Sequence, residues 1–516
     1  MAFVRMGFGK NFCKYHYLNT RLYSFNKSDS KKKALVLGCY VDKPQHYTLT
    51  EGADSFNTAV CGRLSTLLDR VVGNNLDLTK VKLFYDLSDD YSAVAVVGLK
   101  KPNQEEDESE GLNNLKERIR IAAADGAHAL QNLKVDEIEV DGFQDAEAAA
   151  EGVTLKLWCY DEHKNEMDKL KVPKVKLYTG GCNDKDDQWK IGVVKGEAQN
   201  IARRFADAPA NLMTPTIFSE NAKKLFEGVK SVNVTVHDKK WIESQKMNTF
   251  LSVSKGSGEP PTFLEIKYTG KSAESSPIVL VGKGITFDTG GVNLKTASGM
   301  LDMRGDKGGA ASVLATTYGI AKLNLPINVT TLIPLCENMP GSIANKPGDI
   351  IKAMNGKTVR IDNTDAEGRL ILADALHYAS TLKPEFIVDV ATLTGAMMIA
   401  LGGEATGVFT NSNSLWKQLE EAGRYTGDRV WRLPLWKSYG KQLKSSHMVD
   451  LTNIGKSSAG GACSAAAFLK EFVPPVDWMH LDIAGVMGPS LDNPYLRKGM
   501  TGRPTRTLIE FLKSRC

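Results

Sequence analysis

The residues best suited to chemistry lie on one acidic turn near the middle of the chain. The segment Asn363-Thr364-Asp365-Ala366-Glu367-Gly368-Arg369-Leu370 follows a β-rich stretch at residues 357–361 and leads into a helical pattern at residues 370–379. Two carboxylates two positions apart in an extended turn can point the same way and clasp one cation. Arg369 continues this spacing and should place a fixed positive charge beside them. Taken alone, the same letters also fit a helix N-terminus with surface charges, so the chemical interpretation depends on a second polar cluster.

The second cluster lies upstream, after the apolar run Ile278–Val281, which predicts a strand buried on both faces. Glycines flank Lys283 and allow backbone and ligand to approach closely. Asp288, Lys295 and Asp306 follow before the next helical pattern. A lysine and an aspartate that emerge together from a buried strand are costly to bury unpaired, so they need each other or a metal.

Counting charges favours the metal. Four carboxylates would be neutralised by two divalent cations; they belong to Asp288, Asp306, Asp365 and Glu367. A lysine desolvated next to cations can lose its proton, so Lys283 can serve as a neutral amine ligand. Lys295 and Arg369 then remain as excess positive charge, placed to stabilise an oxyanion. Two bridged cations about 3.5–4 Å apart polarise a carbonyl and deprotonate a water. The oxygen-rich set suits zinc, manganese or magnesium and does not choose among them.

A mostly parallel sheet must position these residues. Buried strands are predicted at residues 278–281, 328–335, 358–361, 386–390 and 478–483, with helical patterns between them. The polar clusters follow the first and third of these strands, and open α/β sheets bind ligands at the carboxyl ends of their strands. Upstream, strands at residues 34–38 and 93–97 alternate with helical patterns and predict a second α/β unit.

The predicted fold class is therefore α/β: a smaller N-terminal α/β domain plus a larger C-terminal α/β domain whose mostly parallel sheet carries a two-metal site. We expect the N-terminal domain at residues 33–185, a linking helix and turn at 186–215, and the C-terminal catalytic domain at 216–516. The N-terminal domain shows no catalytic constellation, which favours a role in assembly.

From about Ala34 to the C-terminus, the chain resembles the leucine aminopeptidase family, the two-metal exopeptidases of the cytosolic aminopeptidase type. The turn at residues 363–370 is the family signature. The supporting stretches are Val281–Asp288, Ala391–Ala396, His480–Met487 and Tyr495–Thr505. The resemblance implies a metalloexopeptidase that hydrolyses the N-terminal, preferably apolar and Leu-like, residue from peptides by means of a metal-bridged water.

The resemblance also implies a role for each site residue. One metal would be held by Asp288, Asp365 and Glu367, and the second by Lys283, Asp288, Asp306 and Glu367. Lys295 would polarise the scissile carbonyl, and Arg369 would hold a bicarbonate ion that shuttles a proton. The pocket for the first side chain would be lined by Met303, Thr392, Gly395, Ala484 and Met487. A pocket of methionines and small residues fits an apolar side chain.

Two positions depart from the family pattern. Lys307 stands where a hydrophobic residue is usual after the ligand aspartate, and a cation facing two metals would weaken their binding. The alternative is that Lys307 faces away from the site, because neighbouring helical positions point about 100° apart. Leu301-Asp302 also changes the wall beside Met303. Some duplicated animal members of the family have lost ligands and serve as structural proteins in sperm mitochondria, so a catalytically weak structural protein is the alternative. Every ligand position is filled here, which favours an active enzyme.

The composition describes an ordinary soluble globular protein, with 24% charged and 42% hydrophobic residues over 516 positions. A formal charge of +5 gives no case for nucleic-acid binding, although some bacterial relatives bind DNA. The apolar runs are too short to span a membrane. The eight cysteines form no Cys-x-x-Cys pair and predict reduced thiols. The eight histidines are scattered, and no His-Glu-x-x-His metal motif occurs.

Residues 1–32 differ from the rest of the chain. The first 28 residues hold five basic and no acidic side chains; the basic residues are Arg5, Lys10, Lys14, Arg21 and Lys27. This composition predicts a mitochondrial targeting segment, and the alternative is a disordered tail on a cytoplasmic enzyme. The resemblance further implies a homohexamer with peptide substrates as its partners.

Overall fold

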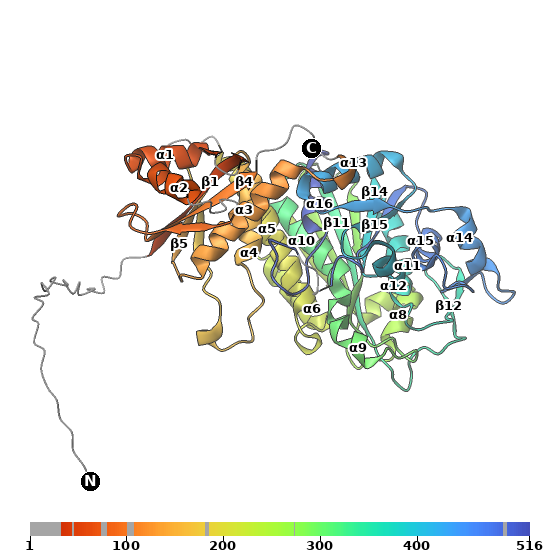
Figure 1. The fold of residues 1–516 in the computed structure, drawn as a ribbon. Helices are drawn as coiled ribbons and strands as arrows, with labels where there is room; N and C mark the ends of the chain where they lie inside the picture. Colours follow the sequence, from red (N-terminus) through yellow and green to blue (C-terminus); the bar gives the residue numbers. More distant parts are fainter. Residues whose placement is uncertain are drawn as a thin grey trace, which may run out of the picture.

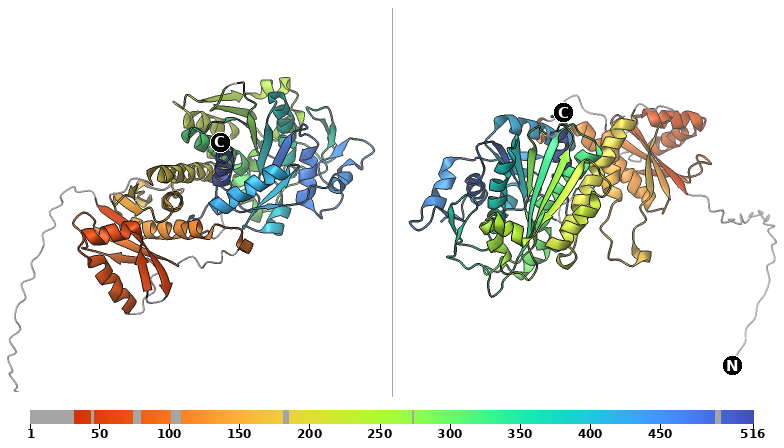
Figure 2. Two further views of the ribbon diagram at one scale, coloured as in Figure 1. Left: turned by 90° about the horizontal axis from the view of Figure 1, so that it is seen from above. Right: turned by 180° about the vertical axis from the view of Figure 1, so that it is seen from behind.

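The computed structural model describes residues 32–43, 46–73, 80–100, 108–180, 185–272, 274–488 and 493–516. The predicted targeting segment thus lies outside the described residues, apart from Lys32. Two α/β units lie side by side, the N-terminal one in red and orange and the C-terminal one in green and blue (Figure 1), with the long helix α5 between them (Figure 2).

The N-terminal unit is built on a six-stranded sheet of order β3-β4-β1-β5-β6, with β2 paired to β1. Strand β1 runs parallel to both β4 and β5, so the expected βαβ connections are present. Its elements are β1 (Lys33–Lys43), β2 (His46–Leu49), α1 (Glu51–Ala59), α2 (Arg63–Gly73), β3 (Lys82–Phe84), β4 (Ala93–Lys100), α3 (Asn114–Gln131), β5 (Glu137–Asp141), α4 (Ala146–Leu157) and β6 (Lys174–Tyr178).

Helix α5 (Asp186–Asp207) joins the units and carries charge into the junction. Lys195 on α5 is fully buried and pairs with Glu147 on α4 and with Glu510 on the C-terminal helix α16 (Thr505–Lys513). Beside it, Glu151 Oε2 lies 2.6 Å from Arg120 Nε on α3 and 2.6 Å from Arg506 Nη1 on α16. Buried ion pairs therefore connect helices of both units.

The C-terminal unit is built on a nine-stranded sheet of order β16-β15-β18-β14-β9-β11-β8-β7, with β10 paired to β11. Its centre is parallel, because β14 runs parallel to β18 and β9, and β9 parallel to β11. The strands are β7 (Val232–His237), β8 (Thr262–Thr269), β9 (Ile278–Gly282), β10 (Gly284–Asp288), β11 (Asn328–Asn338), β14 (Phe386–Ala391), β15 (Thr406–Thr410), β16 (Val430–Arg432) and β18 (Asp477–Asp482).

Helices cover both faces of this sheet. Side chains at alternate strand positions pack into two separate hydrophobic clusters, one against α5, α6, α10, α13 and α16 and the other against α8, α11 and α15. The continuous apolar runs follow from this double burial. The helices are α6 (Pro215–Leu225), α7 (Lys239–Ser244), α8 (Asn248–Ser254), α9 (Ala297–Met300), α10 (Gly308–Lys322), α11 (Gly368–Ala379), α12 (Gly395–Leu401), α13 (Asn413–Thr426), α14 (Lys437–Lys441) and α15 (Gly461–Lys470).

The predicted α/β fold class is confirmed, but the strand predicted at residues 358–361 belongs to a different sheet from the one expected. Residues 358–360 form β13, which pairs with β12 (Ile350–Lys352) and β17 (Leu451–Thr452) in a separate three-stranded sheet. Of its three side chains only Val359 is fully buried, whereas a strand at the centre of the large sheet is buried on both faces. The acidic turn at residues 363–370 therefore reaches the large sheet from a neighbouring small one.

Candidate metal centre

Three predicted ligands converge at the carboxyl ends of the central strands of the large sheet. Asp288 ends β10, while Asp365 and Glu367 lie on the turn between β13 and α11. Each of these carboxylates offers one oxygen atom, and the three atoms lie within 4.8 Å of one another. Asp288 and Glu367 are both only 2% exposed. The two sequence clusters, separated along the chain, thus form one site.

Lys283 brings the fourth carboxylate into the same site. It sits between β9 and β10, where its backbone amide donates to the Val390 carbonyl of β14 at 3.0 Å. Its Nζ lies 2.8 Å from Asp306 Oδ1 and 2.8 Å from Glu367 Oε1. Burial alone would lower the pKa of Lys283, but the neighbouring carboxylates outweigh burial and hold that pKa well above its ordinary value.

Lys295 neutralises the other half of the site. Its Nζ lies 2.7 Å from Asp288 Oδ2 and 2.5 Å from Asp365 Oδ1. Its side chain is 21% exposed, against 3% for Lys283. Two ammonium groups therefore stand among four carboxylates, and Lys295 is the one that solvent and small molecules can reach.

The carboxylates are only partly satisfied by the protein. Asp306 Oδ2 and Glu367 Oε2 are buried, and neither has a hydrogen-bond partner among the described residues. Burial raises the pKa of Glu367, and the charge of Asp288 raises it further. Burial also raises the pKa of Asp306. Buried carboxylate oxygens without donors are what a cation site requires, so the donor set fits divalent metals.

Neighbouring side chains that the sequence did not single out fix the ligands in place. Asn338, at the end of β11, donates from Nδ2 to Asp288 Oδ1 at 2.8 Å and to the Thr364 carbonyl at 3.1 Å. Asn363 accepts the backbone N–H of Asp365 at 2.8 Å. Asn338 lies three residues beyond the strand predicted at 328–335, and a polar residue so soon after a buried strand was a usable signal, because polar residues at strand ends mark such sites.

Arg369 is buried behind the acidic turn. Its Nη1 donates to the Asn453 carbonyl at 2.7 Å, whereas its buried Nε has no partner among the described residues. Burial lowers the pKa of Arg369 to about 10, so the guanidinium keeps its charge at neutral pH. One donor of a buried cation is therefore available to a small anion.

The five predicted pocket residues lie on three segments around the site. Met303 is in the 3₁₀ segment η4 (Leu301–Lys307), Thr392 follows β14, Gly395 begins α12, and Ala484 and Met487 follow β18. Thr392 also contacts the ligands: its hydroxyl donates to Asp306 Oδ1 at 2.7 Å, and its carbonyl accepts from Lys283 Nζ at 2.8 Å. Met487 is buried and packs over Gly308.

Lys307, which departs from the family pattern beside a predicted metal ligand, points away from the carboxylates. It is fully buried, and its Nζ donates to the Ala208 carbonyl at 2.9 Å and to the Arg304 carbonyl at 2.5 Å. Burial lowers the pKa of Lys307 to about 7. Leu301 and Asp302 are both exposed, and Asp302 pairs with Arg304 at 3.0 Å. None of these side chains occupies the site.

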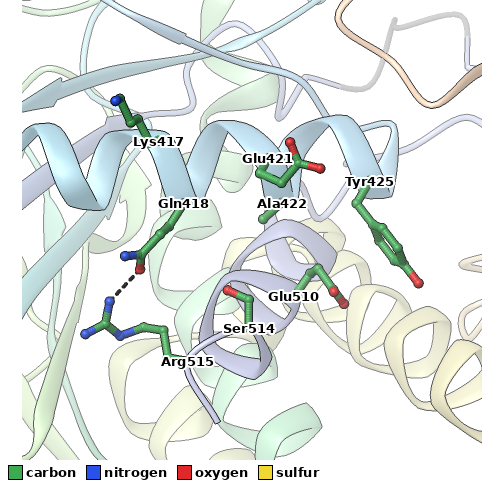
Figure 3. Close-up of a pocket in the computed structure, with 8 residues that line it drawn as sticks. All are labelled: Lys417, Gln418, Glu421, Ala422, Tyr425, Glu510, Ser514 and Arg515. Atoms are coloured by element: carbon green, nitrogen blue, oxygen red, sulfur yellow. Dashed lines mark hydrogen bonds between the residues drawn. The ribbon is translucent and has the colours of Figure 1, made fainter.

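A separate pocket of about 580 Å³ lies between α13 and α16 (Figure 3). Its lining residues are Lys417, Gln418, Glu421, Ala422, Tyr425, Glu510, Ser514 and Arg515. Arg515 pairs with Glu385, just before β14 begins. The pocket therefore opens at the amino ends of the strands, opposite the carboxylate site.

Within the described ranges, no helix combines the length and the apolar character that a membrane crossing needs.

Comparisons with known proteins show the family of this chain. The model of the cytosol aminopeptidase family, catalytic domain, matches residues 200–509, and that of its N-terminal domain matches residues 36–167. The cytosol aminopeptidase of Xenopus tropicalis is 52% identical over 94% of this chain and 93% of its own. The human cytosol aminopeptidase is 51% identical over 93% and 92%.

Solved structures agree as well. The bottromycin maturation enzyme BotP superposes with a TM-score of 0.79 at 28% identity, covering 94% of this chain and 99% of that one, and BotP is also known in complex with Mn. A tomato leucine aminopeptidase mutant superposes with a TM-score of 0.77 at 27% identity, covering 94% of each chain. With both of its domains matched and its acidic site assembled, the chain belongs to the cytosol aminopeptidase family and is a metal-dependent aminopeptidase.

Proposed function

We propose that this protein removes apolar, leucine-like residues from the amino ends of peptides at the carboxylate site. The observation that carries the proposal is the convergence of Lys283, Asp288, Asp306, Asp365 and Glu367, with two buried carboxylate oxygens unpartnered among the described residues. Two divalent cations in such a set polarise a carbonyl and activate water near neutral pH. The donors suit Zn²⁺, Mn²⁺ or Mg²⁺.

We assign the metal ligands as the resemblance implies. Asp288, Asp365 and Glu367 would hold one cation, and Lys283, Asp288, Asp306 and Glu367 the other. Lys283 must lose its proton to act as a ligand, and the charge of the cations favours that loss. The hydrogen bonds from Asn338 to Asp288 and from Thr392 to Asp306 then keep the carboxylates in one orientation.

The two remaining cations act on the substrate. Lys295, the more exposed ammonium, would donate to the scissile carbonyl and stabilise the oxyanion as charge develops. Arg369 offers its unpartnered Nε to a small anion. Bicarbonate bound there would accept the proton from the attacking water and return it to the leaving amine.

The preference for the first side chain is assigned to Met303, Thr392, Gly395, Ala484 and Met487. Two flexible thioethers beside small residues accommodate leucine or methionine better than charged side chains. Release of leucine from a chromogenic amide tests the proposal. The metal-loaded protein should turn the amide over, a chelator should abolish turnover, and Mn²⁺ or Zn²⁺ should restore it. A pure protein that holds two metals per chain yet gives no turnover would refute it.

A structural role is the second candidate, motivated at first by Lys307, Asp302 and the predicted targeting segment. Because Lys307 donates to the carbonyls of Ala208 and Arg304, it gives that role no support. Metal content separates the two: a purely structural protein tolerates empty sites, whereas the enzyme holds about two cations per chain.

Assembly and location complete the proposal. We expect a homohexamer that admits short or unfolded peptides, and sedimentation of the purified protein tests this assembly.

We also expect mitochondrial import directed by residues 1–32, with a cytoplasmic location as the alternative. A reporter fused to these residues should enter mitochondria, and an otherwise identical fusion with Arg5, Lys10, Lys14 and Arg21 changed to glutamine should not.

A further inference from the structure

Asp482 occupies the point at which two parallel strands separate into the walls of the proposed side-chain pocket. It is the last residue of β18 and lies opposite Ala391, the last residue of β14. Beyond Ala391 the chain turns through Thr392 to α12, which Figure 1 labels. Beyond Asp482 it turns toward Met487. Where parallel strands part, the ladder hydrogen bonds end and the first backbone N–H groups of each turn need other acceptors.

The Asp482 carboxylate supplies those acceptors to both turns. From the turn after β14, it accepts the backbone N–H of Leu393 at 3.1 Å and the Thr394 hydroxyl at 2.6 Å. From the turn after β18, it accepts the backbone N–H of Ala484 at 3.2 Å. The Thr394 N–H adds a longer contact of 3.4 Å. One side chain therefore connects two segments about 90 residues apart in sequence.

Each connected segment is also tied to the rest of the site. The Thr394 hydroxyl accepts the N–H of Met397 at 3.1 Å and so caps α12, while Thr392 contacts Asp306. On the other side, Thr501 donates from its hydroxyl to the Val486 carbonyl at 2.6 Å and from its N–H to the Met487 carbonyl at 3.2 Å.

Hydrogen bonds, and no direct ion pair, hold the Asp482 carboxylate. Asp482 is 1% exposed and forms no ion pair within the described part of the chain, although the buried guanidinium of Arg369 acts on it as a nearby opposite charge. A buried carboxylate that is held mainly by N–H and O–H donors is stabilised only while those donors stay in place. The arrangement is therefore rigid, because movement of either turn would leave the carboxylate poorly solvated.

We propose that Asp482 is a positioning residue for substrate selectivity: its carboxylate sets the separation between the Thr392–Gly395 wall and the Ala484–Met487 wall of the first-side-chain pocket. The inference rests on the proposed function, and it adds a residue that does not itself touch the substrate. It predicts that Asp482 governs discrimination between large and small first residues while leaving the metal ligands intact.

The test uses the metal-loaded full chain and compares three variants with the wild type. Asp482→Asn keeps the shape but turns one acceptor into a donor that faces N–H groups. Thr394→Val removes the hydroxyl that donates to Asp482 and that also caps α12, and Thr394→Ser restores both contacts. Asp477→Asn is the matched control, since it makes the same change at the far end of β18, where Asp477 accepts the Ser412 hydroxyl at 2.7 Å.

Two quantities are measured for each protein: the ratio of kcat/KM for leucyl and alanyl amides, and the hydrogen exchange of residues 391–398 and 483–488. Asp482→Asn and Thr394→Val should lower the leucyl-to-alanyl ratio about tenfold, in line with the contribution of one or two methylene groups in a pocket. Exchange should accelerate in both segments for Asp482→Asn. Metal content should not change, and Thr394→Ser and Asp477→Asn should resemble the wild type.

The inference alone is overturned if the wild type is active and both Asp482→Asn and Thr394→Val show the same selectivity ratio and the same hydrogen exchange as the wild type. If Asp482→Asn does not fold, Thr394→Val against Thr394→Ser decides by the same ratio. A metal-loaded wild type that turns over neither amide would refute the proposed function, and the inference would fall with it.

Discussion

The buried ion pairs at the junction of the two units make a quantitative prediction about stability. Glu151 on α4 is fully buried between Arg120 on α3 and Arg506 on α16, with both arginine contacts at 2.6 Å. Lys195 Nζ lies 3.9 Å away. Replacing Glu151 with glutamine leaves three buried cations with less negative charge to balance them. Removing one partner of such a group costs about 3–5 kcal/mol.

The pH dependence of this effect has a definite sign. Burial alone would raise the pKa of Glu151, but Arg120, Arg506 and Lys195 outweigh burial and hold it below the ordinary value of 4.5. The ionised carboxylate therefore stabilises the folded state above pH 4.5, and this contribution is lost as the pH falls through the folded-state pKa. The difference between wild type and Glu151→Gln should be full at pH 7 and should shrink in acid.

Urea unfolding followed by circular dichroism measures this difference at pH 7 and at several acidic pH values. The matched control is Glu162→Gln, which breaks the pair with Arg204 on the surface, where both side chains are about 40% exposed. That pair should contribute at most about 1 kcal/mol. The reasoning is refuted if Glu151→Gln unfolds at the same urea concentration as the control, or if its deficit is the same at every pH.

The remaining predictions concern the metal site. Glu367→Gln should lose both bound metal and leucyl-amide turnover, because Glu367 is assigned to both cations; metal analysis of the purified variant checks this, and normal content would contradict the assignment. Metal affinity should rise from pH 6 to pH 9, because the proton on Lys283 and the raised pKa of Glu367 both oppose binding at low pH; calorimetric titration that finds no dependence would count against a lysine ligand. Lys307→Met should keep metal content and turnover, since its ammonium faces the Ala208 carbonyl. It should also raise the melting temperature most below pH 7, because burial lowers the pKa of Lys307 to about 7 and the cost of burying its charge is full below that value and declines above it.

Much of the fold could be predicted from local pattern. The strands at residues 278–281, 328–335, 386–390 and 478–483 are each present in the structure as β9, β11, β14 and β18. They were recognisable because strands covered on both faces are rich in apolar and β-branched residues, although only residues 278–281 form an unbroken apolar run. The strand at residues 358–360 was also recognisable, but its sheet was not, because pairing partners are chosen by contacts that a local pattern does not encode.

The sequence by itself determined the chemistry of the site. Two segments of the sequence carry five candidate ligands and two further cations. The structure brings six of these side chains together at the carboxyl ends of the central strands, and the seventh, Arg369, lies behind the acidic turn. Residue type and spacing suffice for this because a dense group of carboxylates and lysines can be buried only if its members neutralise one another or bind metal.

Only the tertiary structure decided how the site is supported and which way Lys307 points. Spacing along the chain allowed Lys307 to face the metals or to face away, and the Ala208 carbonyl, 99 residues distant, holds it away. In the same way, Asn338 orients Asp288, and Asp482 joins two turns, through partners 50 to 89 residues away. Hydrogen bonds are short-ranged and directional, so their partners are known only once the strands and turns are placed in space.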